Sequence, residues 1–204
     1  LWPNVSDKSL CSNNDSCMQI MQVINLIDQA LKDIGMFIAV GAMSESLGTS
    51  SIEASHNLFN APLGSKEEVT LRSTAETAAN GDFARGWLGF GSESGLAEFY
   101  EPKEGYSYGY PVTKTHGNAL QSINKWPYTF NNEDISTLST LFLHKSRVSN
   151  AIVRAISISC ELNGIFGNEF NLFESCRHGD SISLMRMFHY LNMNREINEK
   201  EKGK

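Results

Sequence analysis

Three groups of residues in this sequence have types and spacing that can do chemistry, and the first is a His-x-Asp pair. His178 and Asp180, separated by Gly179, have a spacing at which an imidazole and a carboxylate can ligate one metal ion. The only histidine after them, His189, stands just eleven residues further on, and the segment around the pair is polar and turn-like. A site of this kind needs a distant third ligand, so we interpret His178 and Asp180 as part of a turn and predict no metal site here.

The second group is a stretch rich in glycine and aromatic residues, from Ala84 to Pro111. Glycine tolerates positive φ and close backbone approach, and six glycines fall in this stretch. Tyr106, Tyr108 and Tyr110 alternate with small residues, and this period of two predicts a strand with three rings on one face. The stretch is therefore predicted to be a strand and loop with a ring-rich face that lines another group.

Composition sets limits on the protein class. The chain has 204 residues, 41% hydrophobic and 20% charged, which predicts one domain with a real core or a large fragment of a bigger one. The net charge of −6 and the lack of a basic stripe argue against a nucleic-acid-binding role. No run of 18 apolar residues is present, so no membrane partner is expected. No sequence feature specifies an oligomeric state.

The third group is the four cysteines, none of which forms a Cys-x-x-Cys pair, so a zinc site is not expected. Cys11 and Cys17 can form a disulfide in an oxidising compartment. Free thiols in a reducing cytosol are the favoured interpretation for a chain of this size, and we expect a cytoplasmic protein. Because residue 1 is Leu rather than Met, we expect that an upstream part was removed or is not recorded.

The spacing of apolar residues predicts the elements that position these side chains, after a polar leader over residues 1–17. A helix is predicted first, because five apolar residues share one face and Gly35 stands where a C-terminal glycine belongs. These five residues are Ile20, Ile24, Ile27, Leu31 and Ile34. The apolar run from Met36 to Val40 is then predicted to be a buried strand. Ser50 and Glu53 form a capping box that predicts a helix to about residue 60, with Ile52, His56 and Phe59 on one face.

Two elements are predicted in the last third of the chain. The longest helix is expected from Glu133 to Leu162, with acidic residues in its first turn and Asn163-Gly164 as its stop. His144 on this helix is interpreted as solvated. The alternation from Ser181 to Tyr190 predicts a strand, and residues 194–204 form a charged tail.

Four short motifs resemble those of a known protein family. They stand in the order and at the spacing found in the N-terminal region of the isopenicillin N synthase-like, non-haem iron, 2-oxoglutarate-dependent dioxygenases. The motifs are Arg85-Gly86-Trp87, Gly91-Ser92-Glu93-Ser94, Lys103-Glu104-Gly105-Tyr106 and Asn124-Lys125-Trp126-Pro127. Residues 59–67 also resemble the family's "F-F-x-L-P-x-E-E-K" segment. The chain departs from the family where Val40-Gly41-Ala42 lacks a histidine, where Trp87 replaces Tyr and where Leu191 replaces Pro.

The resemblance implies an α+β fold, with a helical N-terminal shell and the first strands of a double-stranded β-helix (jelly roll). It also implies that the chain is truncated before the iron-binding strands, because the family's ligands follow the strand that ends at Tyr190. The implied division is a leader (1–17), an N-terminal dioxygenase region (18–132), a support helix with the first core strand (133–193) and a tail (194–204). His178 and Asp180 precede that strand, so the resemblance also places no metal ligand there.

For function, the resemblance implies the N-terminal part of an oxygenase that oxidises a small organic substrate. Fe(II) and 2-oxoglutarate are expected in the full-length protein, whereas this span is expected to bind neither and to hold no catalytic residue. The alternative is a truncated, non-catalytic relative that serves as a binding or scaffold module.

The residues expected to face substrate or cosubstrate are Arg85, Tyr190, Arg186, Tyr106 and Tyr108. Tyr190 matches a family tyrosine that reaches the cosubstrate or substrate, and a satisfied barrel tyrosine is the equal alternative. Arg85 matches an arginine that contacts a substrate carboxylate in the penicillin-forming members. For Arg85 an ion pair with Glu93 or Glu104 is the favoured alternative. Arg186 lies on the same strand face as Tyr190 by alternation.

Overall fold

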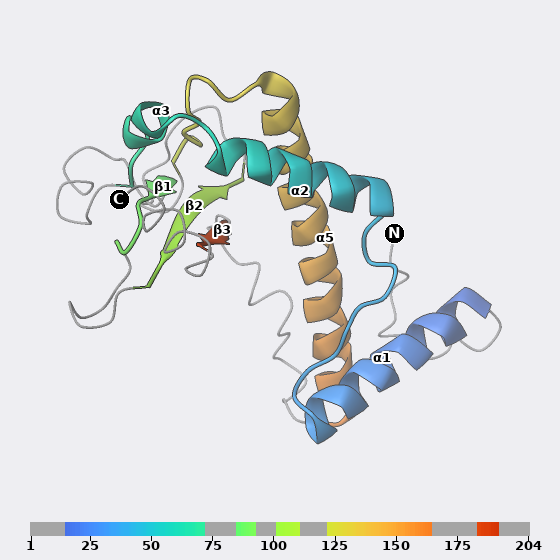
Figure 1. Cartoon of the computed structure of the whole chain (residues 1–204). Helices are drawn as coiled ribbons and strands as arrows, with labels where there is room; N and C mark the ends of the chain where they lie inside the picture. The colour runs from blue at the N-terminus through green and yellow to red at the C-terminus, as the bar shows by residue number, and fades with distance from the viewer. Residues whose placement is uncertain (1–14, 72–84, 93–100, 111–121, 165–182, 192–204) are drawn as a thin grey trace. The chain divides into compact units, whose positions relative to one another are not determined.

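The computed structural model of the chain describes residues 15–71, 85–92, 101–110, 122–164 and 183–191. These residues form helices and one antiparallel sheet, which confirms the predicted α+β class (Figure 1). In chain order the elements are α1 (Asp15–Asp33), α2 (Glu45–Phe59), α3 (Leu63–Glu67), β1 (Gly86–Leu88), β2 (Lys103–Gly109), α5 (Asn132–Leu162) and β3 (Leu184–Tyr190). No helix of the described residues is long and apolar enough to cross a membrane.

The chain divides into two compact units, each built from two stretches of sequence. The first unit comprises Leu1–Ser44 and His144–Asp180, and the second comprises Glu45–Leu143 and Ser181–Lys204. The sheet, α2, α3 and the beginning of α5 all belong to the second unit. The sequence-based division at residues 17, 132 and 193 stays a prediction.

The sheet has the strand order β1-β2-β3, and both neighbouring pairs are antiparallel. Strand residues alternate between two faces. The inner face, which packs on the core, carries the side chains of Trp87, Glu104, Tyr106, Tyr108, Met185, Met187 and His189. The outer face carries Leu88, Lys103, Gly105, Ser107, Gly109, Leu184, Arg186, Phe188 and Tyr190. The predicted strands around Tyr106 and before Tyr190 are therefore confirmed, although β3 begins at Leu184.

The inner face packs on a single hydrophobic cluster of the second unit. Ala54, Leu58 and Phe59 of α2 and Leu138, Leu141 and Phe142 of α5 join the sheet's aromatic residues in this cluster. These helix residues recur at three- and four-residue intervals, so each helix turns one side toward the core. The cluster is what holds the inner face of the sheet in place.

Helix α2 begins at Glu45, five residues before the predicted capping box, so the predicted start was wrong, whereas its end at Phe59 confirms the predicted end near residue 60. The Ser50 hydroxyl donates to the Leu47 carbonyl one turn earlier, which places it inside the helix rather than at its start. Ile52 is 61% exposed, because the packed side of the helix carries Ala54 and Leu58.

In the first unit, α1 confirms the predicted helix, with Ile24 of the predicted stripe fully buried. Ile34, the last residue of that stripe, lies just past the end of α1 and is 72% exposed. Gly35 has a φ of +80°, and its amide donates to Ala30 O, as the predicted C-terminal glycine should. The Asp28 carboxylate accepts from Ser159 Oγ at 2.6 Å, which ties α1 to the last turns of α5. Hydrogen bonds from Lys32 and Ser159 lower the pKa of Asp28.

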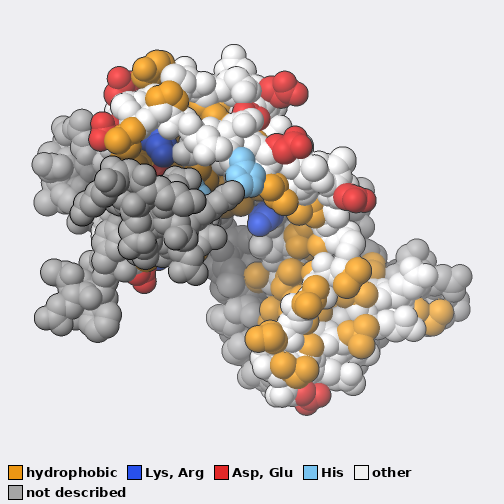
Figure 2. All heavy atoms as spheres, in the orientation of Figure 1, with side chains coloured by type: hydrophobic (Ala, Val, Ile, Leu, Met, Phe, Trp, Pro, Cys, Tyr) orange, Lys and Arg blue, Asp and Glu red, His pale blue; other side chains and the backbone are white. Residues whose placement is uncertain are grey.

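Two predictions about the first unit were wrong. Residues 36–40 form no strand, and Met36, Ile38 and Val40 are 70%, 90% and 93% exposed. An apolar run is buried only where another element covers it, and Figure 2 shows apolar side chains gathered on the surface of this unit. His144 is not simply solvated, because its Nε2 lies 2.6 Å from Ala42 O.

Helix α5 matches its prediction to within one residue. The Asn131 side chain accepts from the Asp134 amide at 2.8 Å and caps the start, and Gly164 has a φ of +64° just past the end. Predictions for Cys11, for the Ser181 end of β3 and for the tail lie outside the described residues, as do those for His178 and Asp180.

Candidate functional site

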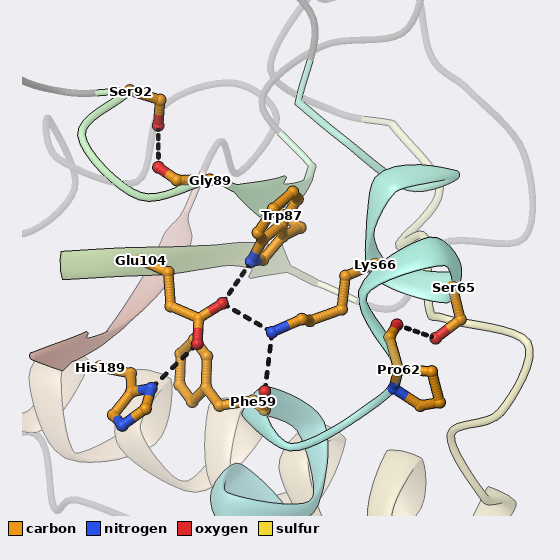
Figure 3. A network of polar contacts seen from close by, with 9 residues as sticks. All are labelled: Phe59, Pro62, Ser65, Lys66, Trp87, Gly89, Ser92, Glu104 and His189. Atoms are coloured by element: carbon orange, nitrogen blue, oxygen red, sulfur yellow. Dashed lines mark hydrogen bonds and ion pairs between the residues drawn. The ribbon is translucent and has the colours of Figure 1, made fainter. Parts of the chain in front are cut away.

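A buried carboxylate lies at the centre of the second unit. Glu104 of β2 is 2% exposed. Its Oε2 accepts from Lys66 Nζ at 2.8 Å and from Trp87 Nε1 at 2.7 Å, and its Oε1 lies 2.9 Å from His189 Nδ1 (Figure 3). One side chain therefore joins α3, β1, β2 and β3. We call Lys66, Trp87, Glu104 and His189 the Glu104 network.

Helix α3 brings Lys66 to this carboxylate. Helix α2 ends at Phe59, and Pro62 stands at the start of the short α3. Lys66 lies in the last turn of α3, 6% exposed, and its Nζ also donates to Phe59 O at 2.8 Å. The ammonium lies 5.4 Å from the centre of the Trp87 ring, within range of a cation–π contact. Lys66 thus closes the turn between the two helices and offsets the charge of Glu104.

A buried ion pair contributes little net stability, because desolvation of both charges offsets their attraction. Removing one partner is costly, however, since it leaves an uncompensated buried charge. The loss of either Lys66 or Glu104 should therefore cost more than the pair itself contributes.

The rings of β2 pack on the Asn-x-Trp-Pro motif. Tyr106 stacks on Trp126 with ring centres 5.5 Å apart and planes 9° apart, and Tyr108 tilts against the same ring at 5.4 Å. Both tyrosines are fully buried, with Tyr106 donating to Lys125 O and Tyr108 donating to Leu138 O at 3.2 Å. Burial raises the pKa of both phenols. Tyr110 contacts Phe142 edge-on, so the three alternating rings do share one side.

The first residue of that motif completes the end of β2. Asn124 accepts from the Gly109 amide at 2.8 Å and donates to the Gly109 carbonyl at 2.9 Å. An amide side chain placed this way mimics a strand partner and satisfies both backbone groups. The motif thus has a structural role in this chain, as cap and stacking partner of β2.

The Arg-Gly-Trp motif also has a physical reason. Gly86 has a φ of +122°, and a Cβ built on it would lie 2.0 Å from Val69 O. The glycine lets Trp87 N donate to Val69 O at 2.9 Å and Leu71 N donate to Trp87 O at 2.7 Å. Arg85, 4% exposed, reaches across to Gly109, where a built Cβ would lie 2.3 Å from its Nη2. Burial lowers the pKa of the Arg85 guanidinium.

The outer face has a different character. Apart from Lys103, the β2 residues on it are small, and Leu88 and Phe188 approach Gly105 from either side. Arg186 lies opposite Ser107, and Tyr190, 64% exposed, lies opposite Lys103. Lys103 Nζ stands 4.8 Å from the centre of the Phe188 ring. The outer face therefore presents cationic groups and accessible rings.

The structure divides the five predicted ligand-facing residues between the two faces. Arg186 and Tyr190 lie on the outer face, and the Arg85 guanidinium reaches that face at Gly109. Tyr106 and Tyr108 lie on the inner face among core side chains. The five residues do not converge on one site.

Glu104 pairs with Lys66 rather than with Arg85, so the expected Arg85–Glu104 ion pair was wrong, and Glu93 lies outside the described residues. Sequence reasoning missed Lys66 and His189 as partners of Glu104. Lys66 stands four residues after Pro62, as the Lys of the "L-P-x-E-E-K" segment stands four residues after its Pro, which was the available signal. His189 shares the alternation of Met185 and Met187, but nothing in the sequence pairs it with Glu104.

Iron is not accommodated by the part of the chain that the structure describes. Those residues contain no group of three or more His, Cys, Asp or Glu side chains placed to hold a metal ion. His189 is engaged through Nδ1 by Glu104, and Glu104 is engaged by three donors. No step of iron chemistry is therefore derived from these residues.

Residues 5–129 match the profile of the family described as non-haem dioxygenase in morphine synthesis N-terminal. The match covers more than half of the chain. The chain belongs to this family. The family match confirms the resemblance stated from the four motifs. The matched residues include the elements of the second unit from α2 to β2. No curated protein sequence matches the chain.

Solved structures of low sequence identity share the fold. A full-length Neurospora crassa protein, solved in complex with alpha-KG and thymine, aligns at a TM-score of 0.61 and 15% identity, covering 93% of this chain and 56% of that one. The C-terminally truncated, apo form of the same Neurospora protein aligns at 0.56 and 19%, covering 90% and 60%. A 2OG-Fe(II) oxygenase family protein from Caulobacter crescentus aligns at 0.53 and 17%, covering 72% and 44%. The chain spans about half the length of these structures.

Proposed function

We propose that this chain is the N-terminal part of a 2-oxoglutarate- and Fe(II)-dependent oxygenase that oxidises a small organic molecule, and that the catalytic iron ligands lie outside this span. The observation that carries the proposal is the family match over residues 5–129. The similarity in fold to the Caulobacter oxygenase family protein supports it, as does the similarity to the Neurospora protein, whose structure was determined with alpha-KG and thymine.

We further propose that the three-stranded sheet begins a jelly roll, which these residues leave incomplete before the iron-binding strands. Support comes from the antiparallel β1-β2-β3 order and from the exposure of β3's outer side chains. When bound in the longer protein, Fe(II) and 2-oxoglutarate would supply the oxidation. The residues described here would bind and orient the organic reactants.

The outer face is the proposed ligand side. Small residues on β2 keep that face shallow, so longer side chains from the flanking segments can reach a ligand above it. Arg85 and Arg186 are suited to a carboxylate, because a guanidinium donates two parallel hydrogen bonds to one. Tyr190 adds an accessible phenol at the other end of the strand pair, opposite Lys103. Tyr106 and Tyr108 contribute to binding in this proposal only indirectly, by holding the shape of β2.

The test begins with the reading frame beyond residue 204. The proposal expects a His-x-Asp pair, a second distant His and an Arg-x-Ser there, and a protein containing them should form succinate from 2-oxoglutarate when Fe(II) is added. The 204-residue chain alone should form none. Measurable turnover by the chain alone would overturn the placement of the iron site, and a stop codon directly after Lys204 would favour a binding or scaffold module instead.

Variants of the longer protein test the outer face. Arg186→Gln and Tyr190→Phe should each raise the KM for 2-oxoglutarate or for the organic substrate, with Arg147→Gln as the control. Arg147 is an exposed arginine on α5. Equal kinetics for all three variants would contradict the assignment of the outer face.

A further inference from the structure

The two faces of β3 present an unexpected distribution of side chains. Leu184, Phe188 and Tyr190 point to the outer face and are 36%, 40% and 64% exposed. The inner face receives Met185 and Met187, together with His189. Hydrophobic burial alone would favour the opposite orientation of β3, in which two aromatic rings and a leucine face the core.

A slip of one residue in the β2–β3 register would make that exchange, because successive side chains point to opposite faces. Register is specified strongly only where something penalises the slipped form. The hydrophobic pattern of β3 does not supply that penalty, so specific contacts have to supply it. On the outer face Phe188 packs against Gly105, and on the inner face the contact is polar.

The specific contact on the inner face joins Glu104 and His189. The two residues are direct partners in the register, and His189 Nδ1 lies 2.9 Å from Glu104 Oε1. The His189 ring also packs against Phe59, with ring centres 5.4 Å apart. The other polar contacts of inner-face β3 side chains are to the sulfur atoms of Met185 and Met187, which are weak acceptors.

We propose that Glu104 and His189 form a positioning pair, which fixes the register of β3 and thereby turns Arg186 and Tyr190 to the outer face. The importance of those two residues for binding rests on the proposed function, whereas the register itself does not. His189 directly precedes Tyr190, so the commitment of one side chain to the inner face commits the next to the outer face.

The slipped register would leave the carboxylate poorly satisfied. Glu104 would then face Phe188, which has no donor, or Tyr190, whose hydroxyl stands at the far end of its ring and not beside Cγ as Nδ1 does, so that it would extend past Oε1. The slip would also turn Arg186 toward the core. Oε2 would still hold Lys66 and Trp87, so the loss falls on the hydrogen bond to His189. Hydrogen bonds to a charged group in a buried setting are among the stronger ones.

The geometry also assigns the tautomer of His189. Because Nδ1 faces a carboxylate that can only accept, Nδ1 is the ring nitrogen that carries a proton and donates to Oε1. ¹⁵N NMR of the His189 imidazole in the 204-residue chain should therefore show that Nδ1 carries a proton in neutral solution. A neutral ring protonated at Nε2 alone would overturn the proposal, and this measurement needs no variant.

Amide hydrogen exchange across β3 then tests the register. His189→Ala should lower the protection of the β3 amides about 10- to 100-fold, the loss expected for a hydrogen bond to a buried charge. His189→Asn should restore most of it, because an amide nitrogen can donate from nearly the same position as Nδ1. His56→Ala is the matched control, since His56 is exposed on α2. Unchanged protection in His189→Ala, or an Asn variant no better than Ala, would overturn the proposal.

These measurements use the isolated chain without cosubstrate, so they separate the two proposals. Loss of the positioning pair leaves the oxygenase proposal intact. Conversely, a full-length protein that fails to form succinate would leave the register result standing.

Discussion

The inner and outer faces of the sheet differ in the burial of their side chains and in the partners of their polar groups. On the inner face Glu104, Tyr106 and Tyr108 are 2%, 0% and 0% exposed, and each polar end group has a protein partner. On the outer face Tyr190 and Phe188 are 64% and 40% exposed. The same strand, β2, contributes alternate residues to both. The contrast in exposure is carried by β3, whose outer residues are exposed while its inner residues Met185, Met187 and His189 are only partly exposed.

This difference teaches that chemical type does not identify a site residue in this chain. Tyr106 and Tyr190 are both tyrosines on neighbouring strands, yet one caps a backbone carbonyl in the core and the other faces outward. Burial and hydrogen-bond partner separate the two roles. Substitutions on the inner face should therefore change stability, and those on the outer face should change binding.

The sharpest way to break this comparison is to remove Lys66 from the Glu104 network. Lys66→Met should lower the free energy of unfolding by about 3–5 kcal/mol, because Glu104 keeps its buried charge without a cationic partner. Lys103→Met is the control on the outer face, where the Lys103–Glu101 pair is partly exposed and contributes at most about 1 kcal/mol. Urea unfolding followed by tryptophan fluorescence measures both, and similar losses would contradict the distinction.

The next largest effect is expected at Gly86. Gly86→Ala should cost about 3 kcal/mol, because φ is +122° and the new Cβ would meet Val69 O at 2.0 Å. Gly64→Ala is the matched control, since nothing lies within 4 Å of its built Cβ and it sits in α3. That substitution should be neutral or stabilising by up to about 1 kcal/mol. A Gly86→Ala variant as stable as wild type in thermal unfolding would show that β1 can move away from Val69.

Much of the fold could be predicted from local pattern. The stripe of α1, the span of α5 and the alternation of β2 and β3 are all repeated over several residues, so a single odd residue does not hide them. The motif resemblance also located β2 correctly. The start of α2 was missed because Ser50 and Glu53 imitate a cap in the middle of a helix.

The partners within the candidate site were harder to predict, because they depend on tertiary contacts. Glu104 and Lys66 are 38 residues apart, and Glu104 and His189 are 85 apart. Sequence spacing alone carries no information about such pairs. Likewise, the exposure of residues 36–40 depends on what covers them, which an apolar run cannot specify.

Alkaline pH gives a third test, through the two buried phenols. The folded state raises the pKa of Tyr106 and Tyr108 by burial, so above about pH 10 the unfolded chain releases their protons while the folded chain keeps them. Stability is therefore fully present below that pH and falls above it, by about 1.4 kcal/mol per pH unit for each phenol. At pH 11 the expected loss is roughly 2–3 kcal/mol.

The control for the alkaline test is a pair of variants. The double variant Tyr106→Phe, Tyr108→Phe should lose most of this pH dependence, whereas Tyr128→Phe, at a side chain 74% exposed, should keep it. Urea unfolding between pH 8 and about pH 11 measures the slope. A wild-type stability that stays flat above pH 10 would mean that the phenols ionise within the folded state.

The smallest expected effect compares one tyrosine from each face. Tyr106→Phe should cost about 1 kcal/mol, because the Lys125 carbonyl loses its donor in a buried position. Tyr190→Phe should change the free energy of unfolding by less than about 0.5 kcal/mol, since its ring is largely exposed. If the outer face binds ligand as proposed, the same Tyr190→Phe change should weaken binding in the longer protein while leaving unfolding untouched. If Tyr106→Phe and Tyr190→Phe had equal effects on stability and on binding, the face on which a tyrosine lies would not determine whether it stabilises the fold or binds ligand.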